Sequence, residues 1–135
     1  MYLIDTSVWV HVLRPHGDST TQERLRPLLI GGQTALIDWV ILELMTGIRS
    51  REDDETLRTF LAPLHKLPVD ERCWDAAFDL AVALRRRGVT PSAADCLIAA
   101  SAIRHRVPLI HMDGDFVAIA RHSRLKEMNW VRDEK

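Results

Sequence analysis

This chain has few cysteines and no segment with the composition of a flexible linker. Its 135 residues include two cysteines, Cys73 and Cys96, which lie far apart and show neither a CxxC pair nor the Cys/His spacing of a zinc site. A disulfide framework and a zinc site are therefore not indicated, and both thiols are expected to be small buried side chains. No Gly/Ser-rich or Pro-rich linker, internal repeat or low-complexity segment divides the sequence, so we expect a single domain over 1–135.

Long uncharged runs are missing too. No uncharged stretch approaches the roughly 18 residues of a membrane span, and the apolar start of the chain meets Asp5 before the apolar core of a secretory signal could form. These features favour a soluble, cytoplasmic protein that makes no membrane contact. The composition, with 47% hydrophobic and 27% charged residues, is typical of globular proteins.

The chain also lacks an excess of basic charge. Its formal net charge of −1 argues weakly against a nucleic-acid partner, because such binders are more often basic. Basic runs occur locally at 85–87, 104–106 and 121–126. They fit solvated helix ends at least as well as phosphate contacts, since cations are favoured at helix C-termini. An acidic catalytic cluster would also subtract charge from an otherwise basic surface.

Short apolar runs alternate with amphipathic segments along the chain. They predict strands at 1–5, 34–37, 67–69, 107–112 and 129–131, and helices at 7–14, 19–30, 39–48, 55–66, 71–87, 93–106 and 113–122. Thr6 or Ser7 is expected to cap the first helix and Asp38 the third, and the charged segment 50–55 is expected to precede the fourth. This alternation favours an α/β fold, a three-layer α/β/α sandwich with a short, mainly parallel sheet. Functional residues of such folds gather beyond the carboxyl ends of the strands.

Two aspartates stand at such strand ends. Asp5 closes the first predicted strand, and Asp113 follows the late strand, with Asp115 two residues further on. Helix capping is an ordinary explanation for Asp5, and a turn is one for the Asp113 pair. Because Thr6 and Ser7 could cap the first helix instead, and because both aspartates lie where chemistry is expected, we predict a functional role for them.

Two further acids lie within apolar helical segments. Glu43 is the only charged residue between positions 38 and 49, and burying an ionised carboxylate without a partner is costly. Asp95 fits a capping box with Ser92. It also shares a helix face with apolar residues such as Ile98 and Ala102. Both acids are therefore predicted to point into the protein and to be functional.

If these carboxylates converge, they require a cation. Two like charges about 4 Å apart repel by roughly 4 kcal/mol at an effective dielectric near 20. Oxygen ligands without a thiolate select hard ions, which indicates Mg²⁺ or Mn²⁺. Such ions share their shell with substrate phosphate and activate water, so the pattern predicts phosphodiester hydrolysis.

Four segments together resemble the PIN-domain family, and within it the VapC-type toxins of toxin–antitoxin pairs. They are LIDTSVW near the start, VILELMTG around Glu43, TPSAADCLIAA around Asp95, and HMDGDF at the late strand. The resemblance implies an α/β/α fold, a metal-dependent endoribonuclease acting on RNA, and a small cognate antitoxin that neutralises it. A homodimer is also expected.

The resemblance further implies roles for individual residues. The core catalytic acids would be Asp5, Glu43, Asp95 and Asp113, with Asp115 as an auxiliary catalytic acid. Asp5, Asp95 and Asp113 would bind the metal, and Ser7 would position water or phosphate. Two positions depart from the family pattern: Met112 stands where relatives often have a polar residue, and Gly114 where they often have a basic one. Both departures concern substrate contacts rather than the metal site.

Other functions remain open at this stage. A catalytically silent PIN-like module that binds RNA or protein is one, and a metal-independent ribonuclease using histidines is another. Six histidines are present without a patterned pairing, and His111 lies inside a predicted strand. A receiver domain or a haloacid-dehalogenase-like phosphatase fits poorly, because both need a lysine near a late strand and the phosphatase needs a second acid after Asp5.

The first two predicted helices are rich in apolar residues. They carry Trp9, Val10, Leu13, Leu25, Leu28 and Leu29. We expect them to form a groove for an amphipathic antitoxin segment, with packing of the same residues in the core as the alternative.

Overall fold

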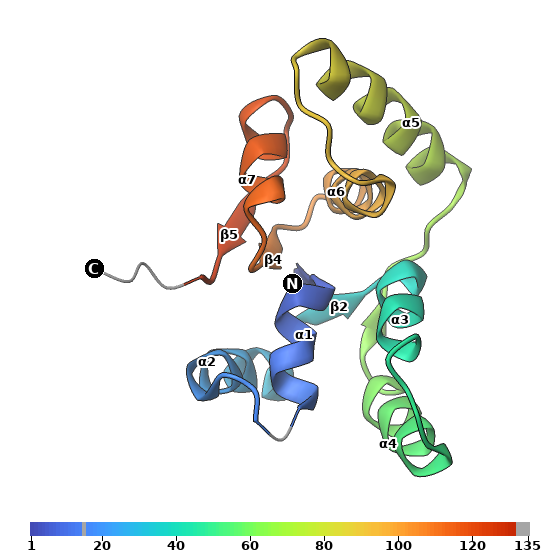
Figure 1. Ribbon diagram of the computed structural model, residues 1–135, viewed down its shortest axis with the longest axis vertical. Helices are drawn as coiled ribbons and strands as arrows, with labels where there is room; N and C mark the ends of the chain where they lie inside the picture. Colours follow the sequence, from blue (N-terminus) through green and yellow to red (C-terminus); the bar gives the residue numbers. More distant parts are fainter. Residues whose placement is uncertain (15, 132–135) are drawn as a thin grey trace.

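The computed structural model describes residues 1–14 and 16–131 (Figure 1). Its strands are β1 (Tyr2–Ile4), β2 (Thr34–Leu36), β3 (His65–Lys66), β4 (Leu109–His111) and β5 (Glu127–Asn129). Its helices are α1 (Thr6–Leu13), α2 (Ser19–Ile30), α3 (Asp38–Met45), α4 (Arg51–Leu61), α5 (Glu71–Arg86), α6 (Ala93–His105) and α7 (Gly114–Arg121).

The five strands form one parallel sheet in the order β3-β2-β1-β4-β5. Strand β1 is central, and Leu3 pairs with Ala35 of β2 on one side and Leu109 of β4 on the other. The strand order reverses between β1 and β4, and such a switch point opens a crevice at the carboxyl ends of the strands. Asp5 and Asp113 follow these two strands.

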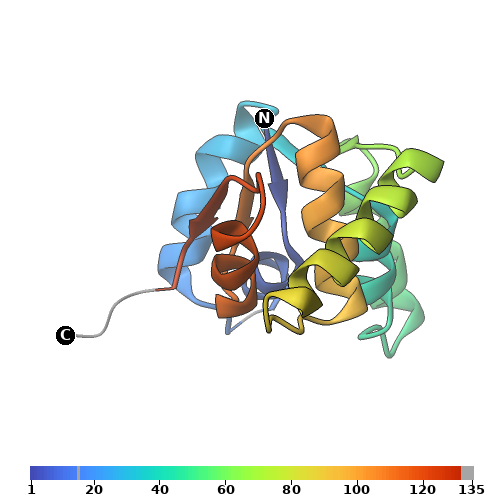
Figure 2. The same ribbon diagram turned by 90° about the horizontal axis from the view of Figure 1, so that it is seen from above.

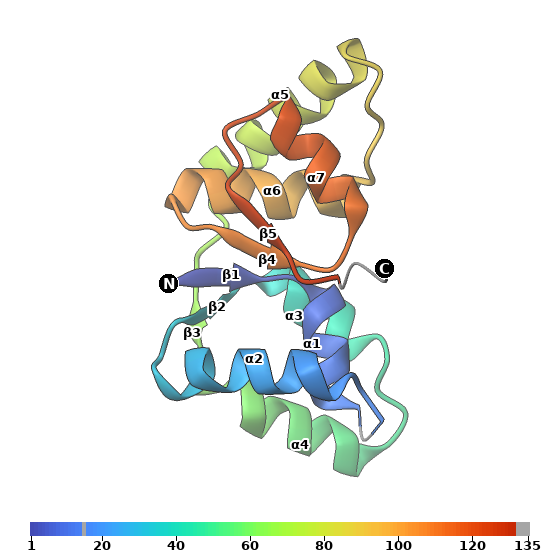
Figure 3. The same cartoon turned by 90° about the vertical axis from the view of Figure 1, so that its left-hand side faces the viewer.

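Helices cover both faces of the sheet (Figure 3). Helices α1 to α4 lie on one side, and α5, α6 and α7 lie on the other. Seen from above, α5 crosses obliquely over α6 (Figure 2) and packs against it as the outermost element of its layer. The predicted three-layer α/β/α architecture with a parallel sheet is confirmed.

Residues that were predicted to line a docking groove on the first two helices are instead packed in the hydrophobic core. Trp9 is fully buried, donates its indole N–H to the Ile4 carbonyl at 3.0 Å and meets Phe60 edge-on. Leu25 is fully buried as well. The remaining four groove residues are partly buried against the same core: Val10, Leu13, Leu28 and Leu29. The groove prediction is wrong for Trp9 and Leu25, because both side chains are fully buried in the hydrophobic core.

Helix α4 departs from its predicted boundaries at both ends. It begins at Arg51 rather than residue 55, because the Ser50 hydroxyl caps it by accepting from Asp53 N at 3.0 Å. The acids of segment 50–55 thus form the first turn, where the positive end of the helix dipole favours them. The helix ends at Leu61 rather than residue 66, since Pro63 has no N–H to continue it.

Smaller shifts affect the edges of the sheet and two caps. Strand β3 occupies His65–Lys66 instead of 67–69, and β5 occupies Glu127–Asn129 instead of 129–131. Helix α3 is preceded by Ile37 as its N-cap, with Asp38 in its first turn, and Asp5 caps α1 in place of Thr6 or Ser7. Within the described ranges, no helix is both long and apolar enough to cross a membrane.

Candidate metal centre

Asp5 joins the end of β1 to the start of α1. It is 5% exposed, and its Oδ2 accepts from both the backbone N–H of Ser7 (3.1 Å) and the Ser7 hydroxyl (2.6 Å). The same hydroxyl accepts from Met112 N at 2.9 Å. Ser7 therefore links the ends of β1 and β4. In this structure its hydroxyl bonds to Asp5 and to the backbone of Met112.

Asp95 lies in the first turn of α6. The Ser92 hydroxyl caps this helix by accepting from Asp95 N at 3.1 Å, which is one half of the capping box that the sequence predicts. The other residues of α6 from Cys96 to Ala102 are buried. The cap therefore fixes the end of a buried helix, and Asp95 lies at that end, close to Asp113 and Asp115.

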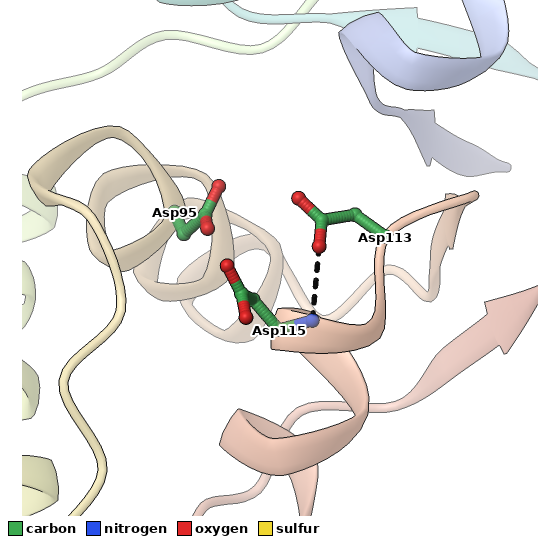
Figure 4. Close-up of side chains that lie close together, drawn as sticks. All are labelled: Asp95, Asp113 and Asp115. Atoms are coloured by element: carbon green, nitrogen blue, oxygen red, sulfur yellow. Dashed lines mark hydrogen bonds between the residues drawn. The ribbon is translucent and has the colours of Figure 1, made fainter.

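Asp113 and Asp115 flank the start of α7. Asp113 is the N-cap of this helix, and its Oδ1 accepts from Asp115 N at 3.0 Å. Figure 4 shows their carboxylates turned toward that of Asp95. One oxygen of each of the three side chains lies within 4.8 Å of the others. This spacing allows all three to share one cation.

The three carboxylates and Asp5 also influence one another electrostatically. The pKa of Asp95 rises from its usual 3.8 to about 7, first because burial removes water from the carboxylate, then because of the negative charges of Asp113, Asp5 and Asp115. A hydrogen bond with Ser92 opposes the rise. Strongly raised carboxyl pKa values of this origin are typical of functional sites.

Glu43, on α3, interacts electrostatically with Asp5. Its Oε1 accepts from the Thr6 hydroxyl at 3.0 Å. Its pKa is raised, mainly by burial and further by the charge of Asp5, while the Thr6 bond lowers it. The acids therefore comprise a close triplet and Asp5, whose charge affects both Asp95 and Glu43.

The structure groups the predicted site residues differently from the expected metal ligands. Asp115, expected as an auxiliary acid, belongs to the closest triplet, whereas Asp5, expected on the metal, lies next to it. Sequence reasoning missed Thr6 as the partner of Glu43 and the backbone of Met112 as the partner of Ser7. It also missed His111, whose ring nitrogen accepts from Asp113 N at 3.1 Å. The only available signal was a histidine within an apolar strand.

The donor set suits a hard divalent cation. Asp95, Asp113 and Asp115 offer oxygen ligands alone, which favour ions such as Mg²⁺ and Mn²⁺ over softer metals. A bound cation would also offset the repulsion that raises the pKa of Asp95.

Comparison with known proteins identifies relatives of the whole chain. The PIN domain family matches residues 2–122. Ribonuclease VapC11 of Mycobacterium tuberculosis is 38% identical over 130 residues, which cover 93% of this chain and 96% of that protein. Ribonuclease VapC21 of the same organism is 33% identical over 133 residues, covering 96% and 93%.

A solved structure has the same fold. The Rickettsia felis VapBC2 complex, bound to a DNA fragment from its promoter, contains a chain that superposes with a TM-score of 0.78 at 21% identity, covering 96% of this chain and 98% of that one. The residues that the family matches, 2–122, include all five predicted catalytic carboxylates. This chain therefore belongs to the PIN domain family.

Proposed function

We propose that this chain is an endoribonuclease that depends on Mg²⁺ or Mn²⁺ and hydrolyses RNA phosphodiester bonds in the cytoplasm. The observation that carries the proposal is the triplet of carboxylates with donor atoms within 4.8 Å of one another. Relatives 38% and 33% identical bear the name ribonuclease, which supports RNA as the substrate class.

The chain's own residues divide the work. Asp95, Asp113 and Asp115 would hold the cation, with Asp5 adding negative charge beside them. When bound, the cation supplies a Lewis acid and an activated water for attack at phosphorus. Glu43, whose pKa burial raises, is suited to exchange a proton with the attacking water or the leaving oxygen.

RNA cleavage assays with a defined metal content test this proposal. Purified protein should cut RNA with Mg²⁺ or Mn²⁺ and stop in EDTA, and Asp113→Asn should lose the activity. Asp38→Asn is the control, because Asp38 is exposed and paired with Lys66. Undiminished cleavage in EDTA would indicate a histidine-based enzyme instead. RNA binding without cleavage, with every metal, would indicate the silent binding module.

We further propose that a cognate antitoxin silences the enzyme. The supporting observations are the VapC names of the relatives and the VapBC complexes among structures of the same fold. An arginine of the antitoxin would pair with the carboxylates that otherwise hold metal, so its binding and metal binding should compete.

Titration of the purified partner with and without Mn²⁺ decides between pocket insertion and remote docking. Mn²⁺ should weaken partner binding to the wild type, and Asp95→Asn should weaken it without metal. A partner affinity indifferent to both changes would contradict insertion into the carboxylate site.

A further inference from the structure

His111 is the last residue of β4 and is fully buried, yet both of its ring nitrogens have partners. Nδ1 accepts from the backbone N–H of Asp113 at 3.1 Å. Nε2 lies 3.1 Å from Oε2 of Glu127, on β5. The imidazole thus stands between the edge strand and one of the three clustered carboxylates.

These partners select one form of the ring. A nitrogen that accepts from a backbone N–H cannot carry a proton itself, so Nδ1 of His111 is unprotonated. The proton of the neutral ring then lies on Nε2, which donates it to the Glu127 carboxylate. Phe116 holds the ring from the side, with ring centroids 5.1 Å apart. His111 is therefore fixed in both orientation and tautomer.

The hydrogen bonds continue from His111 into the carboxylate cluster. The N–H of Asp113 is held by the ring, and the Asp113 side chain in turn accepts from Asp115 N at 3.0 Å. A continuous path thus runs from Glu127 through His111 to two of the three residues of the triplet. Glu127 lies beyond residues 2–122, the segment that the PIN family matches.

Core packing alone does not account for this histidine. Its neighbours on β4, Leu109 and Ile110, are apolar and fully or almost fully buried. A third apolar residue would fill the strand without the cost of burying polar nitrogens. An apolar residue at position 111 would leave the N–H of Asp113 without this acceptor. The backbone of Asp113, which caps α7, would then be held less firmly.

We infer that His111 is a positioning residue, which holds Asp113 and through it Asp115 in the geometry that binds the divalent cation. This inference rests on the proposed metal-dependent function. His111 lies outside the carboxylate triplet; Glu127 bonds the ring at Nε2, and the ring accepts from the backbone N–H of Asp113 at Nδ1. Outer partners of this kind commonly change metal affinity by about 10- to 100-fold when they are lost.

Two substitutions at the same position separate the two hydrogen bonds. In His111→Asn, the side-chain oxygen stands near the place of Nδ1 and can still accept from Asp113 N. In His111→Gln, the longer amide reaches toward Glu127 as Nε2 does, and the acceptor for Asp113 is lost. Each variant keeps one hydrogen bond and breaks the other. Both variants remove the imidazole ring, so an effect of lost packing should be similar in the two.

Mn²⁺ affinity by titration calorimetry and amide hydrogen exchange at Asp113 in EDTA are the two measurements. We expect His111→Gln to bind Mn²⁺ about 10- to 100-fold more weakly than the wild type and to exchange the Asp113 amide faster. His111→Asn should stay within a few-fold of the wild type in both. Thermal melting in EDTA confirms that both variants are folded.

Equal Mn²⁺ affinities for the two variants, whether both unchanged or both reduced, would overturn the inference. Slow Asp113 exchange in His111→Gln would overturn it too. Failure of the wild type to bind Mn²⁺ would instead refute the proposed function, and the exchange comparison in EDTA would still show whether His111 holds Asp113.

Discussion

The carboxyl group of Asp95 changes its charge within the physiological pH range. Its pKa in the folded chain is about 7, against 3.8 ordinarily, because of burial and the charges of Asp113, Asp5 and Asp115. The folded state therefore binds a proton that the unfolded state has already released between about pH 4 and pH 7. The contribution of Asp95 to folding stability therefore falls as the pH rises through this interval, since its carboxyl group binds fewer protons in the unfolded state there.

Thermal melting in EDTA across pH 5 to 8 measures this effect. We expect the metal-free protein to melt at a lower temperature at pH 8 than at pH 5. Asp95→Asn should lose most of that dependence and be the more stable protein at pH 8, because its amide cannot ionise. A wild-type melting temperature that rises between pH 5 and 8 would contradict the described electrostatics.

The Ser7 hydroxyl connects the ends of β1 and β4 through its bonds to Asp5 and Met112 N. In Ser7→Ala, Met112 N loses its acceptor and Asp5 loses its shortest hydrogen bond. We expect a loss of about 1–3 kcal/mol in the free energy of unfolding, measured by denaturant titration. Ser7→Thr keeps the hydroxyl and should retain most of that stability; equal losses in both variants would contradict the bridge.

At the scale of elements, helix caps place the acids. Ser92 caps α6, which carries Asp95, through a bond to N of the third residue after it, and Ser50 caps α4 in the same way. We expect Ser92→Ala and Ser50→Ala each to cost about 1 kcal/mol of stability. Only Ser92→Ala should also weaken Mn²⁺ binding in calorimetry, because α4 carries none of the clustered acids. Equal Mn²⁺ affinity in the two variants would show that the α6 cap does not position Asp95.

Sequence patterns predicted the element types better than their ends. Apolar periodicity depends on which side of an element faces the core, so it identified the seven helices and four of the strands of the described residues. Strand β3 instead occupies residues that were predicted as the end of a helix. Caps depend on side-chain geometry, so Asp5 took the role expected of Thr6 or Ser7, and Ser50 began α4 earlier than expected.

The candidate site was predictable only in part for the same reason. Strand ends and buried positions indicated which acids meet, but not their distances. The sharp start of α7 brings Asp115 into the triplet, and the pairing of β4 with β5 brings Glu127 to His111. Neither arrangement can be read from spacing along the chain.

At the scale of the whole molecule, metal binding and folding should be linked. A cation that binds only the folded chain stabilises it by about 2.7 kcal/mol at a hundredfold excess over its dissociation constant. We therefore expect Mn²⁺ to raise the melting temperature of the wild type and to do so much less for Asp113→Asn. The same melting temperature in EDTA and in Mn²⁺, at concentrations that calorimetry shows to be saturating, would contradict the metal centre.

The outer face of α5 bears on the predicted homodimer. Trp74, Phe78 and Val82 recur every four residues and are 42%, 60% and 54% exposed. If two copies pair through this face, Phe78→Lys should convert a dimer to a monomer in light scattering. Ile30→Lys is the matched control, since Ile30 is 80% exposed on α2. A dimer that survives Phe78→Lys would have to use another surface.

The central place of β1 also has a consequence during protein synthesis. One of its two neighbours in the sheet is β4, which lies about a hundred residues later in the chain. Two of the three clustered carboxylates, Asp113 and Asp115, follow β4. A growing chain on the ribosome therefore holds Asp5 and Glu43 for most of its translation without the acids that complete the centre. If the proposed metal centre carries the activity, chains that stall or are cut before residue 113 should be inactive.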